Sequence, residues 1–272
     1  VTITAADINK LRQTTGAGML DCRKALTESN GDFEAAIDWL RKQGQKVAAK
    51  RSDREAKEGV VIAQTTADHK SGIVLCISCE TDFVSKNADF VAFAQSIADA
   101  AIANDVKTAE ELNGVTVNGA KVEELINDKL AAIGEKIAVS KFERVDAPYV
   151  ASYIHGANRM GVLVSMTKEA AEAGKDVAMQ IAAMNPLAVD ETSISQETKD
   201  REKAIAIEMI KAEGKPAEMA EKIADGKMNK FFKDNTLMHQ AFVKDNSKSV
   251  ADYLKSVDAD LKVTDFKRVA LG

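Results

Sequence analysis

The stretch over residues 72–103, GIVLCISCETDFVSKNADFVAFAQSIADAAIA, begins as a predicted strand and ends as a predicted helix. Residues 73–77 form a short apolar run rich in β-branched side chains, which is typical of a buried strand. Apolar residues then recur at helical spacing from Asp89, which we expect to be the helix N-cap. The predicted buried face of this helix comprises Phe90, Phe93, Ala94, Ile97, Ala98 and Ala101.

One large aromatic residue, Phe83, lies in the polar connector over residues 81–87 between this strand and this helix. Most phenylalanines are buried inside their own domain. Here Asp82 precedes the ring and a Ser-Lys-Asn turn follows it, which favours exposure at the tip of a strand–helix corner. Both placements stay open, and an exposed Phe83 would predict an anchor for a pocket on a partner protein.

The composition indicates an acidic protein of about two domains. The chain has 272 residues, of which 29% are charged, and a net charge of −5. This balance argues against nucleic-acid binding because phosphate contacts require a basic surface. No apolar run approaches the ~18 residues that a membrane span requires, and an odd number of cysteines, three, fits a reducing compartment. We therefore expect a cytoplasmic protein whose partner is another protein, with no direct contact to nucleic acid or membrane.

Residues 1–44 predict a module of three short helices. Thr4 and Asp7 resemble a capping box at the start of the first helix, and Asp32 is expected to cap the third. Apolar residues available for packing recur along these helices, at Ile8, Leu11, Leu20, Cys22, Leu26, Phe33, Ala36, Ile37 and Leu40. Gly16 and Gly18 separate the first two helices as turn formers, because a dinucleotide loop needs a preceding strand and a third glycine.

Beyond this module the chain follows one plan twice. A strand hairpin and a helix within residues 60–103 are followed by the same order of elements within residues 150–184. Gly72 and Gly161, which open the second strand of each hairpin, are 89 residues apart (161 minus 72). Because each sheet needs a helix over its apolar face, the pattern predicts two related α+β subdomains. Their expected extents are residues 60–142 and, for the second, residues 143–186 together with 231–272.

Further elements complete the two predicted subdomains. A helix is expected over residues 122–138, and residues 137–142 are expected to begin a strand. In the tail, a strand edge is expected at Phe242, a helix over residues 249–257 and a final strand over residues 261–270.

Two segments are too charged to belong to these cores. Residues 45–59 mix many charges without an apolar face, which predicts a solvated linker that can be helical. Residues 187–230 predict an inserted hairpin of two helices, with Ser193 and Gln196 as a capping box and Pro216 at the start of the second helix. Its narrow apolar stripe is explained by packing of the two helices on each other, and self-association is the alternative.

No group of residues predicts catalysis or a metal site. Cys76 and Cys79 have the spacing of a redox or zinc motif, but side chains three apart on a strand point to opposite faces. The three histidines are scattered singly, and the sequence contains neither a phosphate-binding loop nor a nucleophile elbow. We expect a protein that is not an enzyme and uses no cofactor and no metal.

Three ordered motifs resemble those of bacterial elongation factor Ts. The first is TTGAGMLDCRKAL over residues 14–26, followed by NGD over residues 30–32. The second is TDFV over residues 81–84, and the third is YIHG over residues 153–156 with GVLV over residues 161–164. The resemblance implies a ubiquitin-associated-like helical module, two related core subdomains and an inserted helical hairpin that resembles a coiled coil or dimerisation motif. A further C-terminal helix, common in the family, has no counterpart among these residues.

The resemblance also implies a function, which is guanine-nucleotide exchange on elongation factor Tu, the GTPase that delivers aminoacyl-tRNA. Asp82 and Phe83 would insert between helices of the GTPase domain and displace elements that hold Mg²⁺ and the β-phosphate. Thr81 and Val84 would lie beside them in the interface. A homodimer or a 2:2 complex with the GTPase stays open.

The other implied contacts come from the first and third motifs. Arg12, Met19 and Leu20 match the module that grips a helix of the same GTPase domain. His155, with Gly156 beside it, matches a residue that approaches the phosphate-binding loop, although a histidine in a turn is equally explained as a surface residue. The alternative function is an adaptor or chaperone-like binding protein built on the helical module, and a cysteine-dependent redox enzyme is the remaining one.

Overall fold

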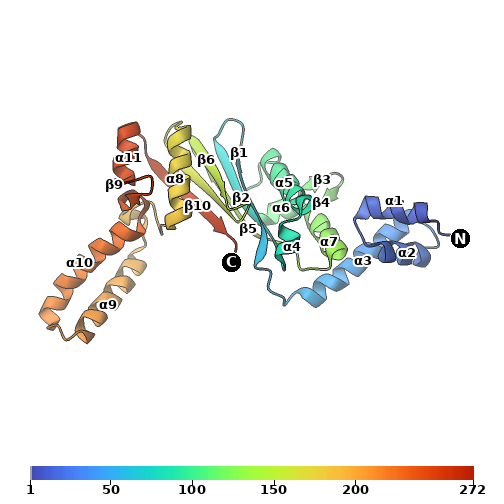
Figure 1. The fold of residues 1–272 in the computed structure, drawn as a ribbon, viewed down its shortest axis with the longest axis horizontal. Coiled ribbons are helices and arrows are strands. Elements are labelled where there is room, and N and C mark those ends of the chain that lie inside the picture. The colour runs from blue at the N-terminus through green and yellow to red at the C-terminus, as the bar shows by residue number, and fades with distance from the viewer. Residues whose placement is uncertain (1) are drawn as a thin grey trace.

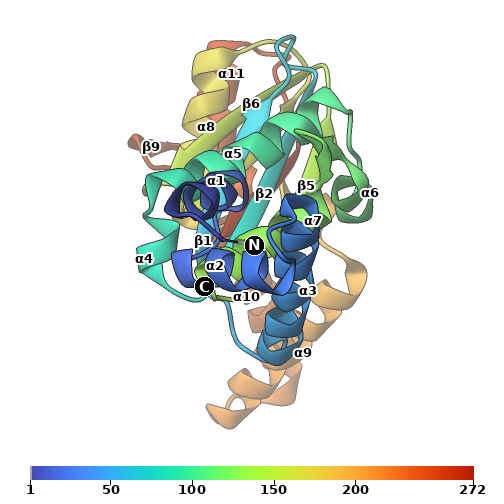
Figure 2. The ribbon, with the colours of Figure 1, turned by 90° about the vertical axis from the view of Figure 1, so that its right-hand side faces the viewer.

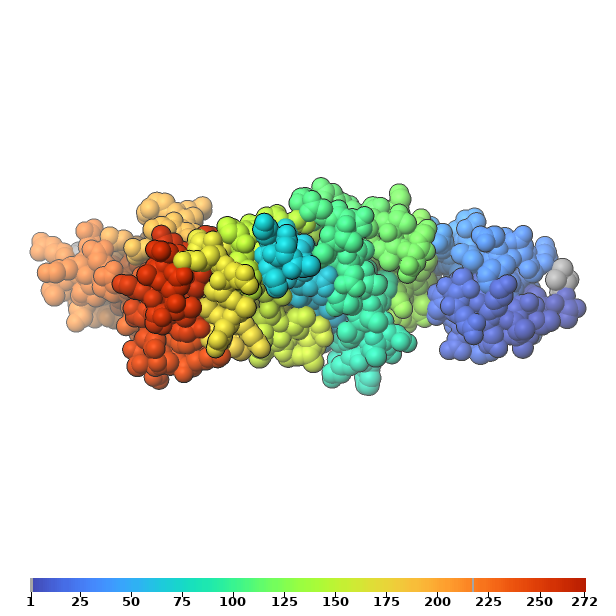
Figure 3. Space-filling view, turned by 90° about the horizontal axis from the view of Figure 1, so that it is seen from above, coloured from blue at the N-terminus to red at the C-terminus, as the bar shows by residue number. Residues whose placement is uncertain are grey.

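The computed structural model describes residues 2–272, except for the side chain of Ala217, and shows the expected α+β fold. The molecule is elongated, with a lobe of three helices at one end, two sheets in the middle and a helical hairpin at the other end (Figure 1). Seen from above, the N-terminal helices stand apart from the sheet region as a lobe of their own (Figure 3).

The N-terminal lobe forms from local signals that the sequence carries. Its helices are α1 (Ala5–Thr15), α2 (Met19–Glu28) and α3 (Phe33–Arg51). The predicted capping box of Thr4 and Asp7 is confirmed, and Asp32 caps α3 by accepting a 2.8 Å hydrogen bond from the amide of Ala35. Gly16 ends α1 with a φ of 71°, a conformation that glycine adopts without strain. The core of the lobe contains Leu11, Ala17, Cys22, Ala25, Leu26, Ala36 and Leu40.

Helix α3 extends far into the segment that was expected to be a solvated linker. Its last two turns are buried on one side, because Val47 and Ala48 pack against the core of the first sheet. Gly44 lies so close to α7 (Val122–Ile133) that a Cβ atom built on it would be 2.7 Å from the Cβ of Ala131. The prediction of no apolar face was wrong here, because residues 47 and 48 lie three and four positions after residue 44 and so share one side of the helix with it.

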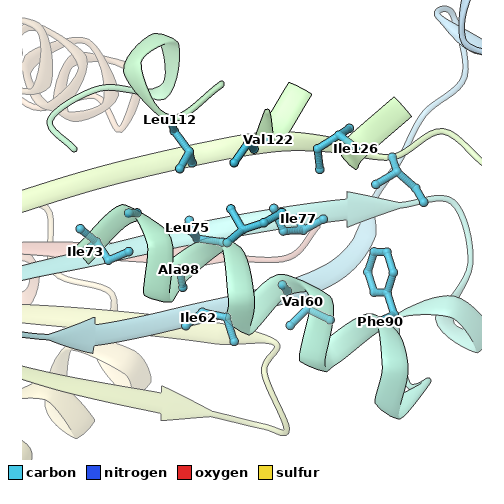
Figure 4. Packing of buried hydrophobic residues seen from close by; sticks show 14 of the residues in the cluster. Val60, Ile62, Ile73, Leu75, Ile77, Phe90, Ala98, Leu112, Val122 and Ile126 are labelled. Atoms are coloured by element: carbon cyan, nitrogen blue, oxygen red, sulfur yellow. The ribbon is translucent and has the colours of Figure 1, made fainter. Parts of the chain in front are cut away.

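The first sheet has three antiparallel strands in the order β1–β2–β5. They are β1 (Glu58–Thr65), β2 (Ser71–Cys79) and β5 (Ala138–Asp146). Helix α5 (Ala88–Ala103) covers one face, where Phe90 and Ala98 meet the apolar side chains of β1 and β2 (Figure 4). The N-cap of α5 is Asn87, whose side chain accepts from the amide of Asp89, so the prediction of Asp89 as the cap was wrong. Phe93 is only partly buried, whereas the rest of the predicted buried face of α5 is confirmed.

Three elements lie between α5 and β5. They are α6 (Ala109–Gly114), the short hairpin of β3 (Thr116–Val117) and β4 (Ala120–Lys121), and α7. Neither α6 nor this hairpin was predicted from the sequence. Helix α7 ends at Ile133, five residues before the expected end, and is capped by Gly134, which has a φ of 79°. Strand β5 then continues through residue 142, the expected subdomain boundary, and pairs with β2 as far as Asp146.

The second sheet has the order β10–β7–β6 and is covered by α8 (Ala171–Met184). Its strands are β6 (Tyr149–His155), β7 (Met160–Met166) and β10 (Val263–Ala270). Helix α11 (Val250–Val257), capped by Ser249, and the strands β8 (Ala241–Phe242) and β9 (Asp245–Ser249) complete this half. The predicted strand edge at Phe242, the helix after Ser249 and the final strand are confirmed.

The two sheets pack face to face, and their contacts repeat with the spacing of the sequence repeat. A Cβ atom on Gly72 would lie 2.8 Å from Val150, and one on Gly161 would lie 3.0 Å from Val61. The amide of Val61 donates to the carbonyl of Asn158 at 2.8 Å, and the amide of Val150 donates to that of His69 at 2.6 Å. Each of these contacts made by the first half has a counterpart made by the second half. Corresponding residues in the two contacts are 89 positions apart (161 minus 72, 150 minus 61). The interface between the sheets therefore has an approximate two-fold relation.

The inserted hairpin consists of α9 (Gln196–Ala212) and α10 (Ala217–Asn235) and projects from the second half (Figure 1). Ser195 caps α9 by accepting from the amide of Thr198, so the predicted capping box of Ser193 and Gln196 was wrong by two residues. Ser193 belongs instead to a single 3₁₀ turn, Glu191–Ser193. Helix α10 continues past residue 231 before the 3₁₀ turn Leu237–His239 returns the chain to the second core. Mutual packing of the hairpin helices buries Ile210, Ala220 and Ala224.

The cysteine spacing is explained by the strand that carries it. Cys76 faces the second sheet and Cys79 faces the helical side of the first sheet, as strand alternation predicts. All three cysteines are free and buried, and burial raises the pKa of the Cys76 thiol. Residues 2–272 contain no cluster of three or more metal-ligating side chains. None of the helices in this range combines the length and apolar character needed to cross a membrane.

Candidate partner-binding surface

The corner between β2 and α5 presents Phe83 to solvent. A single helical turn, α4 (Asp82–Ser85), fills this corner, and the side chain of Phe83 is 85% exposed. The residue that follows points the other way, because Val84 packs against the core of the first sheet and Ser85 is buried. Of the two placements that the sequence left open for Phe83, exposure at the tip is the one observed. The ring therefore projects from a corner that is anchored beneath it.

Asp82 lies beside Phe83 as a carboxylate held by a local ion pair. The Nζ atom of Lys86, one turn later, is 2.7 Å from its Oδ2 atom. This hydrogen bond lowers the pKa of Asp82 below its usual value, so the group is ionised at neutral pH. Both residues are exposed, which makes the pair weak enough to be exchanged for another partner.

Phe83 also lines a groove between the N-terminal lobe and the first core. The groove encloses about 820 Å³ and is bounded by the end of α1 and by α3 on one side. On the other side lie α4, α5, α7 and the turn between β3 and β4. Figure 2 shows the three N-terminal helices in front of this helical face of the sheet. Apolar, aromatic and basic side chains line it, among them Ile37, Arg41, Phe83, Phe93, Lys129 and Ile133.

The predicted contact residues of the N-terminal lobe lie at the turn between α1 and α2. Leu20 is 81% exposed and Met19 is 49% exposed, and Arg12 in the last turn of α1 is also exposed. The expectation that Leu20 is available for packing inside the lobe was wrong, because that face of α2 is turned away from α3. Exposed apolar side chains in the first turn of α2 suit a partner contact. Residues 13–16, directly after Arg12, line the groove.

The turn between β6 and β7 carries His155 and Gly156. His155 is exposed, and its Nδ1 atom is 3.0 Å from the hydroxyl of Tyr153. Arg159 in the same turn forms an ion pair of 3.1 Å with Glu58, which pairs with Cys79 at the end of β2. The structure therefore brings this turn to the same end of the first sheet as the α4 corner.

Comparison with known proteins gives the family of the chain. A family model described as "Elongation factor TS" matches residues 80–272. The elongation factor Ts of Christiangramia forsetii is 51% identical over 99% of both chains. The chain belongs to the elongation factor Ts family. The resemblance inferred from the three motifs is thereby confirmed, and the chain is a translation elongation factor.

Two further relatives extend the match to the N-terminal lobe, which the family model does not cover. The elongation factor Ts of Flavobacterium psychrophilum is 50% identical over 100% of this chain and 99% of its own. That of Clostridium perfringens is 43% identical over 99% of this chain and 93% of its own. The similarity to elongation factor Ts therefore extends over the N-terminal lobe. The roles of the individual surface residues stay predictions.

Proposed function

We propose that this elongation factor Ts promotes release of GDP from elongation factor Tu by inserting Phe83 and Asp82 beside the Mg²⁺ and β-phosphate site. The observation that carries the proposal is a phenylalanine side chain that is 85% exposed on a corner fixed by the first core. An exposed aromatic ring gains apolar burial only in a pocket of another molecule. Family membership identifies the class of that molecule as a translational GTPase.

Exchange of this kind needs no active site. An exchange protein of this kind binds the nucleotide-free GTPase more tightly than the nucleotide-bound GTPase. The two ligands therefore weaken each other: the exchange protein lowers the affinity for the nucleotide as many-fold as the nucleotide lowers the affinity for the exchange protein. Mg²⁺ bridges the phosphates of the bound nucleotide, and its displacement removes a main electrostatic contact. We propose accordingly that the chain is not an enzyme and acts without a cofactor or catalytic residue of its own.

The carboxylate of Asp82 supplies the electrostatic part of this proposal. It is ionised and paired only with the exposed Lys86, so it can leave this pair at small cost in the complex. Near the metal ligands of the GTPase it acts by hydrogen bonding or by repulsion. Thr81 and Val84 fix the ends of the turn that presents it.

Two additional contacts follow from the placement of the other motifs. Arg12, Met19 and Leu20 are proposed to grip a helix of the GTPase domain from the lobe side of the groove. His155 and Gly156, at the same end of the first sheet as α4, are proposed to face the phosphate-binding loop. The proposed setting is the cytoplasm, and sedimentation of the purified complex would distinguish a 1:1 from a 2:2 assembly.

The direct test is the variant Phe83→Ala, assayed by release of fluorescent GDP from purified elongation factor Tu. Truncation of a buried aromatic anchor costs on the order of 2–4 kcal/mol, so stimulated release should slow by roughly 30-fold or more. Leu187→Ala is the matched control, because Leu187 is also largely exposed, at 59%, but lies after α8 in the second half. Unchanged stimulation by Phe83→Ala, with the control also unchanged, would refute the proposed mechanism.

A further inference from the structure

A carboxylate from a distant part of the chain holds the base of the Phe83 corner. Glu135 directly follows Gly134 at the end of α7. Its Oε2 atom accepts hydrogen bonds from the amides of Glu80 and Thr81, both at 3.1 Å. Its Oε1 atom accepts a hydrogen bond from the hydroxyl group of Thr81 at 2.7 Å. Three donors on the two residues that precede α4 therefore converge on one side chain.

The side chain of Glu80 in turn forms a hydrogen bond to the segment that carries Glu135. Its carboxylate accepts from the amide of Lys136 at 2.7 Å and from the guanidinium of Arg51 at 2.8 Å. The Nζ atom of Lys136 in turn donates to the carbonyls of Ser52 at 2.6 Å and Arg54 at 3.0 Å. We call this set of residues the carboxylate clasp. Its members are Arg51, Glu80, Thr81, Glu135 and Lys136.

The corner depends on such contacts because α4 is too short to hold its own shape. It has four residues, and its N-cap, Thr81, makes no capping hydrogen bond with its side chain. A single helical turn fixes several dihedral angles for few hydrogen bonds and is unstable in isolation. In the chain, Phe83 lies between Thr81, which the clasp holds, and Val84, which packs on the core.

The clasp also reaches the element that carries the N-terminal lobe. Arg51 is the last residue of α3, and α3 leads directly back into the lobe. Its ion pair with Glu80 is largely buried, with side-chain exposures of 28% for Arg51 and 13% for Glu80. Hydrogen bonds between charged groups are stronger when water is excluded. The end of α3 and the base of the Phe83 corner are thus joined through one carboxylate.

We propose that Glu135 is a positioning residue of the exchange surface. Through Thr81 and Glu80 it holds Phe83 in its projecting direction and fixes α3, so that the lobe and the corner meet the GTPase as one rigid unit. This inference rests on the proposed function of Phe83. The corresponding strand-to-helix connection of the second half is built differently, since Thr167 there bonds to the backbone of Lys262 and presents no aromatic ring.

The test is a double-mutant cycle on GDP release with Glu135→Ala, Phe83→Ala and the combined variant. Glu135→Ala alone should lower the maximal stimulated rate about tenfold, which corresponds to ~1.4 kcal/mol. In the Phe83→Ala background it should have almost no further effect, because the ring that it positions is already missing. Glu135→Gln, which keeps one acceptor oxygen and the same shape, should recover part of the loss. Hydrogen exchange should quicken at the amides of residues 80–85 in Glu135→Ala.

Glu124→Ala is the matched control. Glu124 lies in the first turn of α7 and, like Glu135, accepts from a backbone amide, that of Lys121 at 3.1 Å, but it does not touch the corner. This variant removes the acceptor of one exposed amide, whereas Glu135→Ala removes the acceptor of three donors, and it should keep full exchange activity. If Glu135→Ala slows stimulated GDP release equally with and without the Phe83 ring, Glu135 has a general structural role. That result would overturn this inference but not the proposed function. If Phe83→Ala itself stimulates normally, the proposed function fails, and the positioning role fails with it.

Discussion

The two halves of the core share one scaffold and differ in the connections between its strands and helices. Each half has a strand hairpin and a covering helix, and their sheets meet through contacts that repeat at the same spacing. In the first half, residues 80–87 join β2 to α5 and include the α4 turn with Phe83. In the second half, residues 167–170 join β7 to α8 without such a turn. The turn that carries the projecting ring is therefore an addition to the scaffold that the two halves share.

The second half has an addition of a different kind. Between α8 and β10 it carries the hairpin of α9 and α10 and the segment up to α11. That segment is fastened by a buried carboxylate, Asp176 on α8, which accepts from Lys244 and from the hydroxyl of Tyr253. We expect the Glu135 carboxylate of the first half to support the proposed exchange surface, and the Asp176 carboxylate to support the stability of the second half.

The variant Asp176→Ala should lower the stability of the protein without changing its exchange activity, and this is the largest effect that we expect. The substitution leaves the Tyr253 hydroxyl and the Lys244 ammonium without their partner, at a cost of about 2–4 kcal/mol in the free energy of unfolding. Urea denaturation should show this loss, whereas factor-stimulated GDP release at 25 °C should be unchanged. A fall in exchange activity of the folded variant would break the division between the halves.

Gly72→Ala and Gly161→Ala test whether the sheets pack with two-fold symmetry. Each added Cβ would lie 2.8–3.0 Å from valine methyl groups of the opposite sheet, so each variant should lose about 1–3 kcal/mol of stability. The two losses, measured by chemical denaturation, should agree within about 1 kcal/mol because the contacts are reciprocal. A loss confined to one variant would show that only one sheet can adjust.

The smallest effect that we expect is the contribution of the Glu80 carboxylate to the pH dependence of stability. The hydrogen bond from the amide of Lys136 and the nearby Arg51 hold the pKa of Glu80 below its usual value. Its contribution to stability is therefore complete above the ordinary glutamate pKa of about 4.3 and is lost as the pH falls through the lower value in the folded state. Glu80→Gln should flatten the decline in stability between about pH 5 and pH 3.

The second half supplies the control for this titration. Asp258 is paired with Lys168 at 2.6 Å, and that hydrogen bond also lowers its pKa, but both side chains are about 40% exposed. Asp258→Asn should change the acid decline less than Glu80→Gln, and added salt should remove most of its effect. An equal or larger change from Asp258→Asn would contradict the importance of burial at the clasp.

Local sequence signals determined the elements of this protein and the class to which it belongs. The capping box at Thr4, the β-branched run of β2, the opposite faces of Cys76 and Cys79 and the polar surroundings of Phe83 were all readable because each depends on a few neighbouring residues. The errors were local as well: Asn87 and Ser195 took the cap positions assigned to nearby residues.

Only the tertiary structure decided which distant residues support the site. Glu135 is 54 positions from Thr81, and a lone glutamate after a helix carries no signal of a partner that far away. The same holds for the packing of Gly44 on α7, which joins the lobe to the core, and for the turn of His155, which reaches the end of β2. Periodicity and capping are properties of short segments, whereas a shared carboxylate or a shared groove exists only after the segments have packed.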